Sequence, residues 1–259
     1  MSVELELPKE KTMEGASFRD LAWFIYGPPG IGKTTFFANV PDTWFMHTDP
    51  GLRFVTAYKT PIVLWRQFTG LVDRLVKEPR QPYGIIVIDT VDLLYTACVA
   101  HVCGARNIEH LSDESYGKGY EMVRGEFGTY ISRLMNLDYG VAFISHSKEV
   151  EIRGRTIKTS KIVPTLPRQA REVVMPMVDI IGYAGYEEGA ADTEEAERFM
   201  FFRPSETLEA KDRTGMLPDK CRLEYGEVKG LLAAGGIRDD DKAPEKPATQ
   251  LRKKKRAIA

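Results

Sequence analysis

The stretch Gly27-Pro28-Pro29-Gly30-Ile31-Gly32-Lys33-Thr34-Thr35 decides the fold of this chain. It matches G-x-x-x-x-G-K-[ST] at every fixed position, the signature of a phosphate-binding loop. An apolar run over 21–26 precedes the loop and a helix-forming run over 35–39 follows it. The alternative is a glycine-rich turn that matches by chance. The flanking strand and helix favour a site for a nucleoside triphosphate.

The residue types of the loop predict how a nucleotide is held. Glycines let the backbone N–H groups of the loop converge on a polyphosphate at the positive end of a helix, so residues 27–35 are expected to surround the phosphates. Lys33 is expected to contact the β- and γ-phosphates, and the Thr34 hydroxyl to bind Mg²⁺. ATP and Mg²⁺ are therefore the expected cofactors.

Length and composition limit the class of protein. The chain has 259 residues, 43% of them hydrophobic, which suffices for one sizeable core. A net charge of -1 excludes a uniformly basic protein, so any nucleic-acid surface must be local. The cysteines Cys98, Cys103 and Cys221 show no C-x-x-C spacing, which favours reduced thiols and argues against a zinc site. With no membrane-length apolar run and no signal peptide, we expect a soluble cytoplasmic protein without membrane contact.

Apolar strands alternate with helical patterns from residue 21 onward, which predicts an α/β fold with a mostly parallel sheet flanked by helices. We expect a nucleotide-binding core over 20–235, an N-terminal arm over 1–19 and a disordered charged tail over 236–259. The expected strands are 21–26, 43–47, 84–89, 140–145, 178–183 and 198–202, and the expected helices are 65–76, 91–102 and a long one carrying Tyr120 to Leu134.

Asp89 ends an apolar strand downstream of the loop, the arrangement of a Walker B carboxylate that holds Mg²⁺. A strand-end aspartate could instead cap the next helix. Because ligands bind at the carboxyl ends of parallel strands, the polar residues that follow the other strands are also candidates. These are His47, Asp49, Ser145 and His146.

Four segments resemble, in chain order, the motifs of RecA-type recombinases. They are 45–52, 86–91, 143–146 and 211–215. Residues 20–220 as a whole are similar to the compact, phage-borne RecA-core ATPases that act in single-strand annealing or recombination. The resemblance implies a RecA-like core, a DNA-stimulated ATPase, and a phage-encoded protein in a bacterial host.

The resemblance also assigns roles to residues outside the loop. Asp49 would orient or deprotonate the attacking water, although the family usually has glutamate there; an ordinary turn over 49–51 is the alternative. His146 replaces the expected glutamine and would sense the γ-phosphate, or it simply caps a strand end. Lys211 and Arg213 would reach the nucleotide of a neighbouring subunit, which implies a homo-oligomer, either filament or ring. Their alternative is a solvated charge pair in a surface turn.

The expected DNA contacts are cations placed where RecA-like proteins carry their DNA-binding loops. Seven cations between 148 and 171 stand against glutamates at 149, 151 and 172, and Tyr116 and Tyr120 flank a further lysine in the earlier loop. Lysine and arginine neutralise phosphates, and aromatic rings stack on bases. A solvated hairpin and an ordinary helix start are the alternatives. The candidates are Lys118, Lys148, Arg153, Arg155, Lys158, Lys161, Arg168 and Arg171.

The sequence therefore predicts an ATPase of RecA type that binds single-stranded DNA and promotes annealing or recombination. The alternative is a ring-forming AAA-type or DnaB-like ATPase, such as a helicase or helicase loader. A small-molecule kinase is disfavoured because no lid of paired arginines follows the nucleotide strands. A single-strand-binding protein is a candidate partner, although no residue indicates it.

Overall fold

The computed structural model describes residues 17–153, 158–187 and 196–238. Its strands are β1 (Ala22–Gly27), β2 (Thr43–His47), β3 (Tyr58–Pro61), β4 (Ile85–Asp89), β5 (Gly140–Arg153), β6 (Lys158–Pro164), β7 (Ile180–Tyr186), β8 (Arg198–Phe201), β9 (Lys211–Asp212) and β10 (Lys220–Arg222). They form one sheet in the order β10-β8-β7-β1-β5-β4-β2-β3, with β6 paired to β5 and β9 to β7. The central pairs are parallel and β6, β8, β9 and β10 are antiparallel. The predicted α/β class with a mostly parallel sheet is confirmed.

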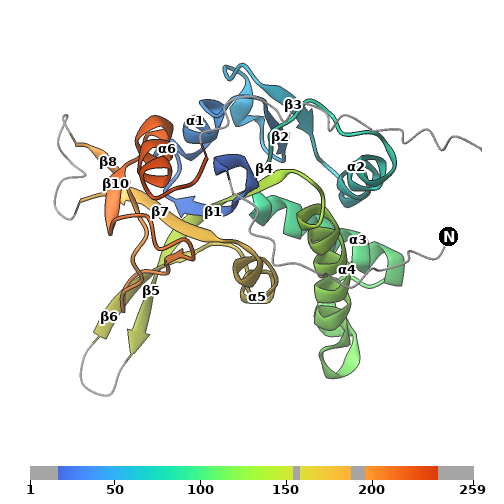
Figure 1. Cartoon of the computed structure of the whole chain (residues 1–259). Coiled ribbons are helices and arrows are strands. Elements are labelled where there is room, and N and C mark those ends of the chain that lie inside the picture. The colour runs from blue at the N-terminus through green and yellow to red at the C-terminus, as the bar shows by residue number, and fades with distance from the viewer. Residues whose placement is uncertain (1–16, 154–157, 188–195, 239–259) are drawn as a thin grey trace, which may run out of the picture.

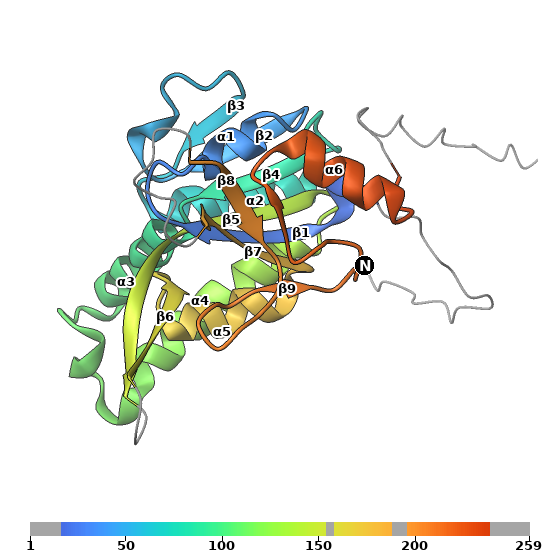
Figure 2. The same cartoon turned by 90° about the vertical axis from the view of Figure 1, so that its left-hand side faces the viewer.

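Helices cover both faces of this sheet (Figures 1 and 2). They are α1 (Lys33–Ala38), α2 (Trp65–Lys77), α3 (Val91–Arg106), α4 (Lys118–Met135), α5 (Arg168–Met177) and α6 (Tyr225–Ala234). The helices α1 and α6 contribute to one hydrophobic cluster, and α2 to α5 contribute to the other. Short 3₁₀ turns lie at Phe18–Asp20, Pro50–Leu52, Leu111–Asp113 and Ser115–Gly117.

The central strand β1 shows how the sequence builds both layers. Successive side chains of a strand point to opposite faces, so Trp23 and Ile25 join the α1–α6 cluster while Phe24 and Tyr26 join the α2–α5 cluster. All four are fully buried. Each large apolar side chain removed from water contributes roughly 1.5–3 kcal/mol, so a strand with this pattern is stable only in the middle of a two-sided sheet.

The register of the central strands brings their carboxyl ends together. Gly27, the first residue of the phosphate loop, lies opposite His146 in β5. Asp89 lies opposite Ile144 on one side and His47 on the other. The predicted site residues of four separated segments therefore share one edge of the sheet.

Several boundaries differ from the sequence-based prediction. Strand β5 runs beyond the predicted residue 145 to Arg153 and forms an antiparallel arm with β6 (Figure 1). The helices α5 and α6 and the short strands β3, β9 and β10 were not predicted. Ser17, Phe18 and Arg19, which the sequence assigned to the arm, are buried against the core. The rest of the predicted N-terminal arm (1–16), Arg155 and the tail from 239 lie outside the described residues. Within the described part, no helix has the length and apolar character needed to cross a membrane.

Candidate nucleotide-binding site

The phosphate loop connects β1 to α1 and depends on two of its glycines. Gly32 has φ 113°, a left-handed conformation that residues with a Cβ rarely adopt, and its carbonyl accepts the first helical hydrogen bond from Phe36 N at 2.9 Å. A Cβ on Gly27 would lie 2.2 Å from the carbonyl oxygen of Ala184 in β7. The loop conformation therefore needs glycine at both ends.

Lys33 begins α1 and turns its side chain back into the loop. Its Nζ donates hydrogen bonds to the carbonyls of Gly27 at 2.8 Å and Pro28 at 2.9 Å. The residue is only 5% exposed, and this burial lowers the pKa of Lys33 from 10.5 to about 8 against the opposing pull of Asp89, Asp92 and Asp49. A phosphate anion would restore the preference for the charged ammonium.

Thr34 and Asp89 meet across the loop. The Thr34 hydroxyl donates to Oδ2 of Asp89 at 2.7 Å, and Asp89 is 4% exposed. Burial raises the pKa of Asp89 above its ordinary 3.8, while the Thr34 hydrogen bond and the positive charge of Lys33 oppose that rise. The Thr34 hydrogen bond and the charge of Lys33 do not fully offset the cost of burying the Asp89 carboxylate, so this carboxylate is well suited to bind a cation.

The residues present fit a magnesium ion that is shared with a nucleotide. A hydroxyl and a carboxylate oxygen converge, and both are the hard ligands that Mg²⁺ prefers. No group of three or more metal-binding side chains occurs in the part of the chain that the structure describes. Mg²⁺ is usually held by one or two carboxylates together with substrate phosphates and water, which matches this pair. Thr34 and Asp89 would hold the ion, which would neutralise phosphate charge.

Asp49 lies at the same edge and already has a local hydrogen bond. Its Oδ1 accepts from Gly51 N at 2.8 Å and caps the 3₁₀ turn, as in the turn alternative of the sequence analysis. The negative charge of Asp49 also raises the pKa of Asp89. His47 Nδ1 donates to the Asp49 carbonyl at 2.7 Å. The position is therefore compatible with a second role for Asp49 toward water.

His146 lies opposite Gly27, at the same edge of the sheet. Its Nδ1 is buried with no hydrogen-bond partner among the described residues. Its carbonyl accepts from Thr165 N at 2.9 Å. The imidazole therefore lies next to the phosphate loop, and the described part of the protein leaves one of its ring nitrogens without a partner.

Next to His146 lies a polar network of which the sequence analysis named only Ser145. Oδ1 of Asp92 accepts from Ser145 Oγ at 2.9 Å and from Thr165 Oγ1 at 2.6 Å. Asp92 is on α3, three residues after Asp89 at the end of β4, whereas Thr165 directly follows β6. The network therefore connects the Walker B segment to both strands of the arm. The one sequence signal for this network is the charged Asp92 among the apolar residues that begin α3.

The geometry above is that of a P-loop nucleotide site, and the sequence over residues 19–214 matches a known family with the description "AAA domain". The chain belongs to the AAA domain family. No curated protein matches it. The chain thus has an AAA-type ATPase domain. The matched residues include the phosphate loop, Asp89 and the carboxyl ends of the central parallel strands.

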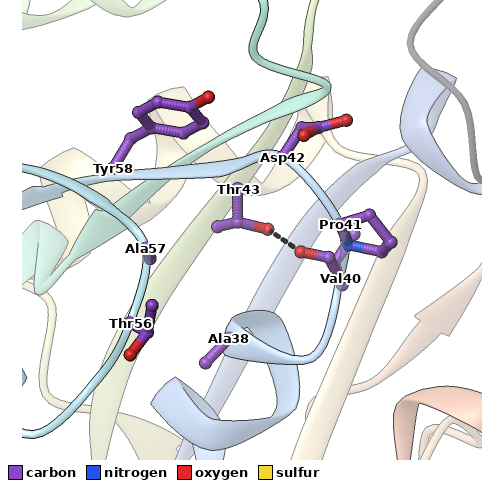
Figure 3. A pocket seen from close by; sticks show the side chains of 8 residues that line it. All are labelled: Ala38, Val40, Pro41, Asp42, Thr43, Thr56, Ala57 and Tyr58. Carbon is purple, nitrogen blue, oxygen red and sulfur yellow. Dashed lines mark hydrogen bonds between the residues drawn. The ribbon is translucent and has the colours of Figure 1, made fainter.

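This AAA domain has a cavity of about 340 Å³ beside the phosphate loop, which the sequence analysis also missed. It is lined by Gly32, Thr35 and Asn39 from the loop and α1, and by Arg198 and Tyr225 from the opposite side. Nη1 of Arg198 donates to the Ile31 carbonyl at 3.4 Å. A second cavity at the other end of α1 begins at Thr43 and Tyr58, at the amino ends of β2 and β3 (Figure 3). That cavity is at the edge of the sheet opposite to the phosphate loop.

Lys211 and Arg213 do not join this site within one chain. They lie on and just after β9, which pairs with the amino end of β7. Lys211 Nζ donates to the carbonyls of Met175 and Val178, and Arg213 donates to the Pro176 carbonyl and forms an ion pair with Asp179 at 2.9 Å. Both cations therefore satisfy the C-terminal end of α5.

The predicted DNA-binding cations separate into several groups. Lys148 on β5 and Lys118 at the start of α4 are exposed. Arg168 and Arg171 lie on α5, outside the β5–β6 arm. Ion pairs hold three cations: Arg168 with Glu172, and both Lys161 and Arg171 with Glu209. For Arg153 and Lys158 only the backbone is described, and Arg155 is outside the described residues.

Proposed function

We propose that this AAA-type ATPase hydrolyses ATP with Mg²⁺ and binds single-stranded DNA in a nucleotide-dependent way, as an annealing or recombination protein does. One observation carries the proposal. Strand β5 passes without interruption from His146, beside the phosphate loop, into the basic arm that it forms with β6. A change at the γ-phosphate could therefore move the arm through a single strand.

The network around Asp92 supports the same coupling. Asp92 binds Ser145 at the start of the arm and Thr165 at its end, so both strands of the arm are tied to the helix that follows Asp89. A rigid hydrogen-bonded connection of this kind transmits a displacement, whereas a flexible loop would absorb it.

The chemistry of the arm and of the α4 start supports DNA as the ligand. Lys148 is exposed and can neutralise a phosphate without reading sequence. Tyr116 is 100% exposed and Tyr120 is 42% exposed, which leaves both rings accessible to bases. The N-terminal end of α4 and the far end of the arm lie on the same side of the molecule (Figures 1 and 2). A strand of nucleic acid could contact both.

Within this proposal, Asp49 orients the attacking water and His146 senses the γ-phosphate. Lys211 and Arg213 act on the nucleotide of a neighbouring subunit. Because these two cations lie far from the phosphate loop of their own chain, such a role requires an oligomer and their release from α5. A ring-forming helicase or helicase loader would share the ATP site, and its assembly on DNA would differ.

The test is the ATPase rate with and without single-stranded DNA, with negative-stain microscopy of the same mixture. We expect DNA to raise the rate, and Lys148→Glu to reduce DNA binding and this stimulation while the basal rate is retained. Lys77→Glu on α2 is the control for charge. If DNA neither stimulates hydrolysis nor forms an assembly with the protein, the proposed function is wrong. Closed rings in place of filaments would favour the helicase-like alternative.

A further inference from the structure

Glu209 lies between two of the cations that we assigned to DNA. Its Oε1 is 3.3 Å from Nζ of Lys161 on β6, and its Oε2 is 3.2 Å from Nη1 of Arg171 on α5. Nη1 of Arg171 is also 3.3 Å from Oε1, so one carboxylate holds both cations. The side chains of Lys161, Arg171 and Glu209 are 26%, 21% and 24% exposed. Partial burial leaves their interaction less screened than that of a surface pair.

The backbone holds Glu209 in this position independently of its side chain. Its carbonyl accepts from the Tyr26 hydroxyl at 2.7 Å, and its N–H donates to the same hydroxyl at 3.1 Å. Two residues earlier, the Thr207 carbonyl accepts from Ile162 N at 2.8 Å, which ties the segment to β6. Replacement of the carboxylate should therefore leave the path of the chain intact.

The two cations are suited to a phosphate. A phosphodiester carries one negative charge and two free oxygens, as a carboxylate does, and lysine and arginine bind both groups. Nε of Arg171 is buried and has no hydrogen-bond partner among the residues that the structure describes. The guanidinium thus has donor capacity that Glu209 does not use.

We propose that Lys161 and Arg171 form one subsite for a nucleic-acid phosphate and that Glu209 closes this subsite in the free protein. The inference rests on the proposed function and adds a regulation to the same surface. An incoming phosphate must displace a carboxylate of the same chain, which is present at high effective concentration. A single phosphate therefore competes poorly, while a strand that also contacts Lys148 can open the subsite.

The experiment compares Glu209→Gln with Glu172→Gln by fluorescence anisotropy of a labelled oligo-dT at several salt concentrations. Both variants remove one negative charge, but Glu172 pairs with Arg168, whose side chain is already 83% exposed. We expect Glu209→Gln to tighten binding roughly threefold to tenfold. One additional phosphate contact should steepen the dependence of log K on log salt by about 0.7. Glu172→Gln should stay close to the wild type, and thermal unfolding checks that every variant is folded.

Lys161→Ala provides the second part of the experiment. In the wild type it should change affinity little, because Glu209 already occupies Lys161; in the Glu209→Gln background it should abolish the gain. Equal tightening by both glutamine variants would be a general charge effect and would overturn the inference. An equal loss from Lys161→Ala in both backgrounds would show an open subsite and would also overturn it. In either case DNA binding persists, whereas absence of binding by wild type and Glu209→Gln alike would overturn the proposed function as well.

Discussion

The Thr34 hydroxyl donates a hydrogen bond to the buried carboxylate of Asp89 at 2.7 Å, and this contact joins the phosphate loop to the Walker B strand. The two residues are 55 positions apart in the chain, and the parallel packing of β1, β5 and β4 brings them together. The same contact brings together two oxygens that would hold Mg²⁺, and it places a carboxylate inside the protein.

We predict that Asp89→Asn lowers the ATPase rate by at least about 100-fold, the usual cost of removing a group that stabilises transition-state charge. In the absence of nucleotide it should raise the unfolding temperature at neutral pH. Burial raises the pKa of Asp89 in the folded protein above 3.8, the ordinary value that applies to the unfolded chain. The free energy of unfolding therefore decreases as the pH rises from 3.8 through the pKa of the folded protein. The amide avoids this loss. The stability gain should vanish below pH 3.8, and a variant less stable than the wild type at pH 7 would contradict the account.

The lowered pKa of Lys33 predicts that nucleotide binding takes up protons. Near pH 8 part of the free protein has a neutral Lys33, and phosphates favour the charged form. ATP affinity should therefore fall as the pH rises from about 8 toward 10.5. Over the same range the nucleotide-free protein becomes more stable, because the buried Lys33 is neutral in the folded state while the unfolded chain still binds the proton. Calorimetry in buffers of different ionisation enthalpy measures the uptake. Lys33→Arg should show none, and equal uptake in that variant would exclude Lys33 as the group.

The cavity beside α1 predicts where the nucleoside lies. If the base lies in this cavity, the Asn39 amide can hydrogen-bond to it, and Asn39→Ala should weaken ATP binding about threefold to tenfold. Binding of tripolyphosphate, which has no base, should remain unchanged. Asn136→Ala, directly after the end of α4, is the control. If both ligands weaken together, the residue acts on the loop and not on the base.

The contacts of Lys211 and Arg213 predict separable effects on stability and activity. Arg213→Ala removes an exposed ion pair and a helix-end hydrogen bond, so the loss of stability should be about 1 kcal/mol or less. If Arg213 acts across a subunit interface, ATP hydrolysis by the oligomer is lost. Mixing Arg213→Ala with Lys33→Ala subunits should then restore activity at interfaces that combine the two intact residues. Full activity of an Arg213→Ala oligomer would rule out this role.

The elements that sequence reasoning found are those with a strong local pattern. Strands β1, β4 and the start of β5 are continuous apolar runs, and their alternation with helices left few topologies for the sheet. The helices α5 and α6 were missed because α5 contains Pro176 and α6 contains Gly226 and Gly230, which are poor helix formers. Packing of Val174 and Leu232 into the two cores outweighs that propensity.

By itself the sequence determined the phosphate loop, its lysine and threonine, and the strand-end Asp89, because these depend on short-range spacing and on one buried strand. Only the tertiary structure decided which of the remaining charges are available. It placed Glu209 against Lys161 and Arg171, Asp92 between Ser145 and Thr165, and Lys211 with Arg213 at the end of α5. Such pairings join residues distant in the chain, and the energy of a charge depends on what lies within a few ångströms of it, which no local pattern records.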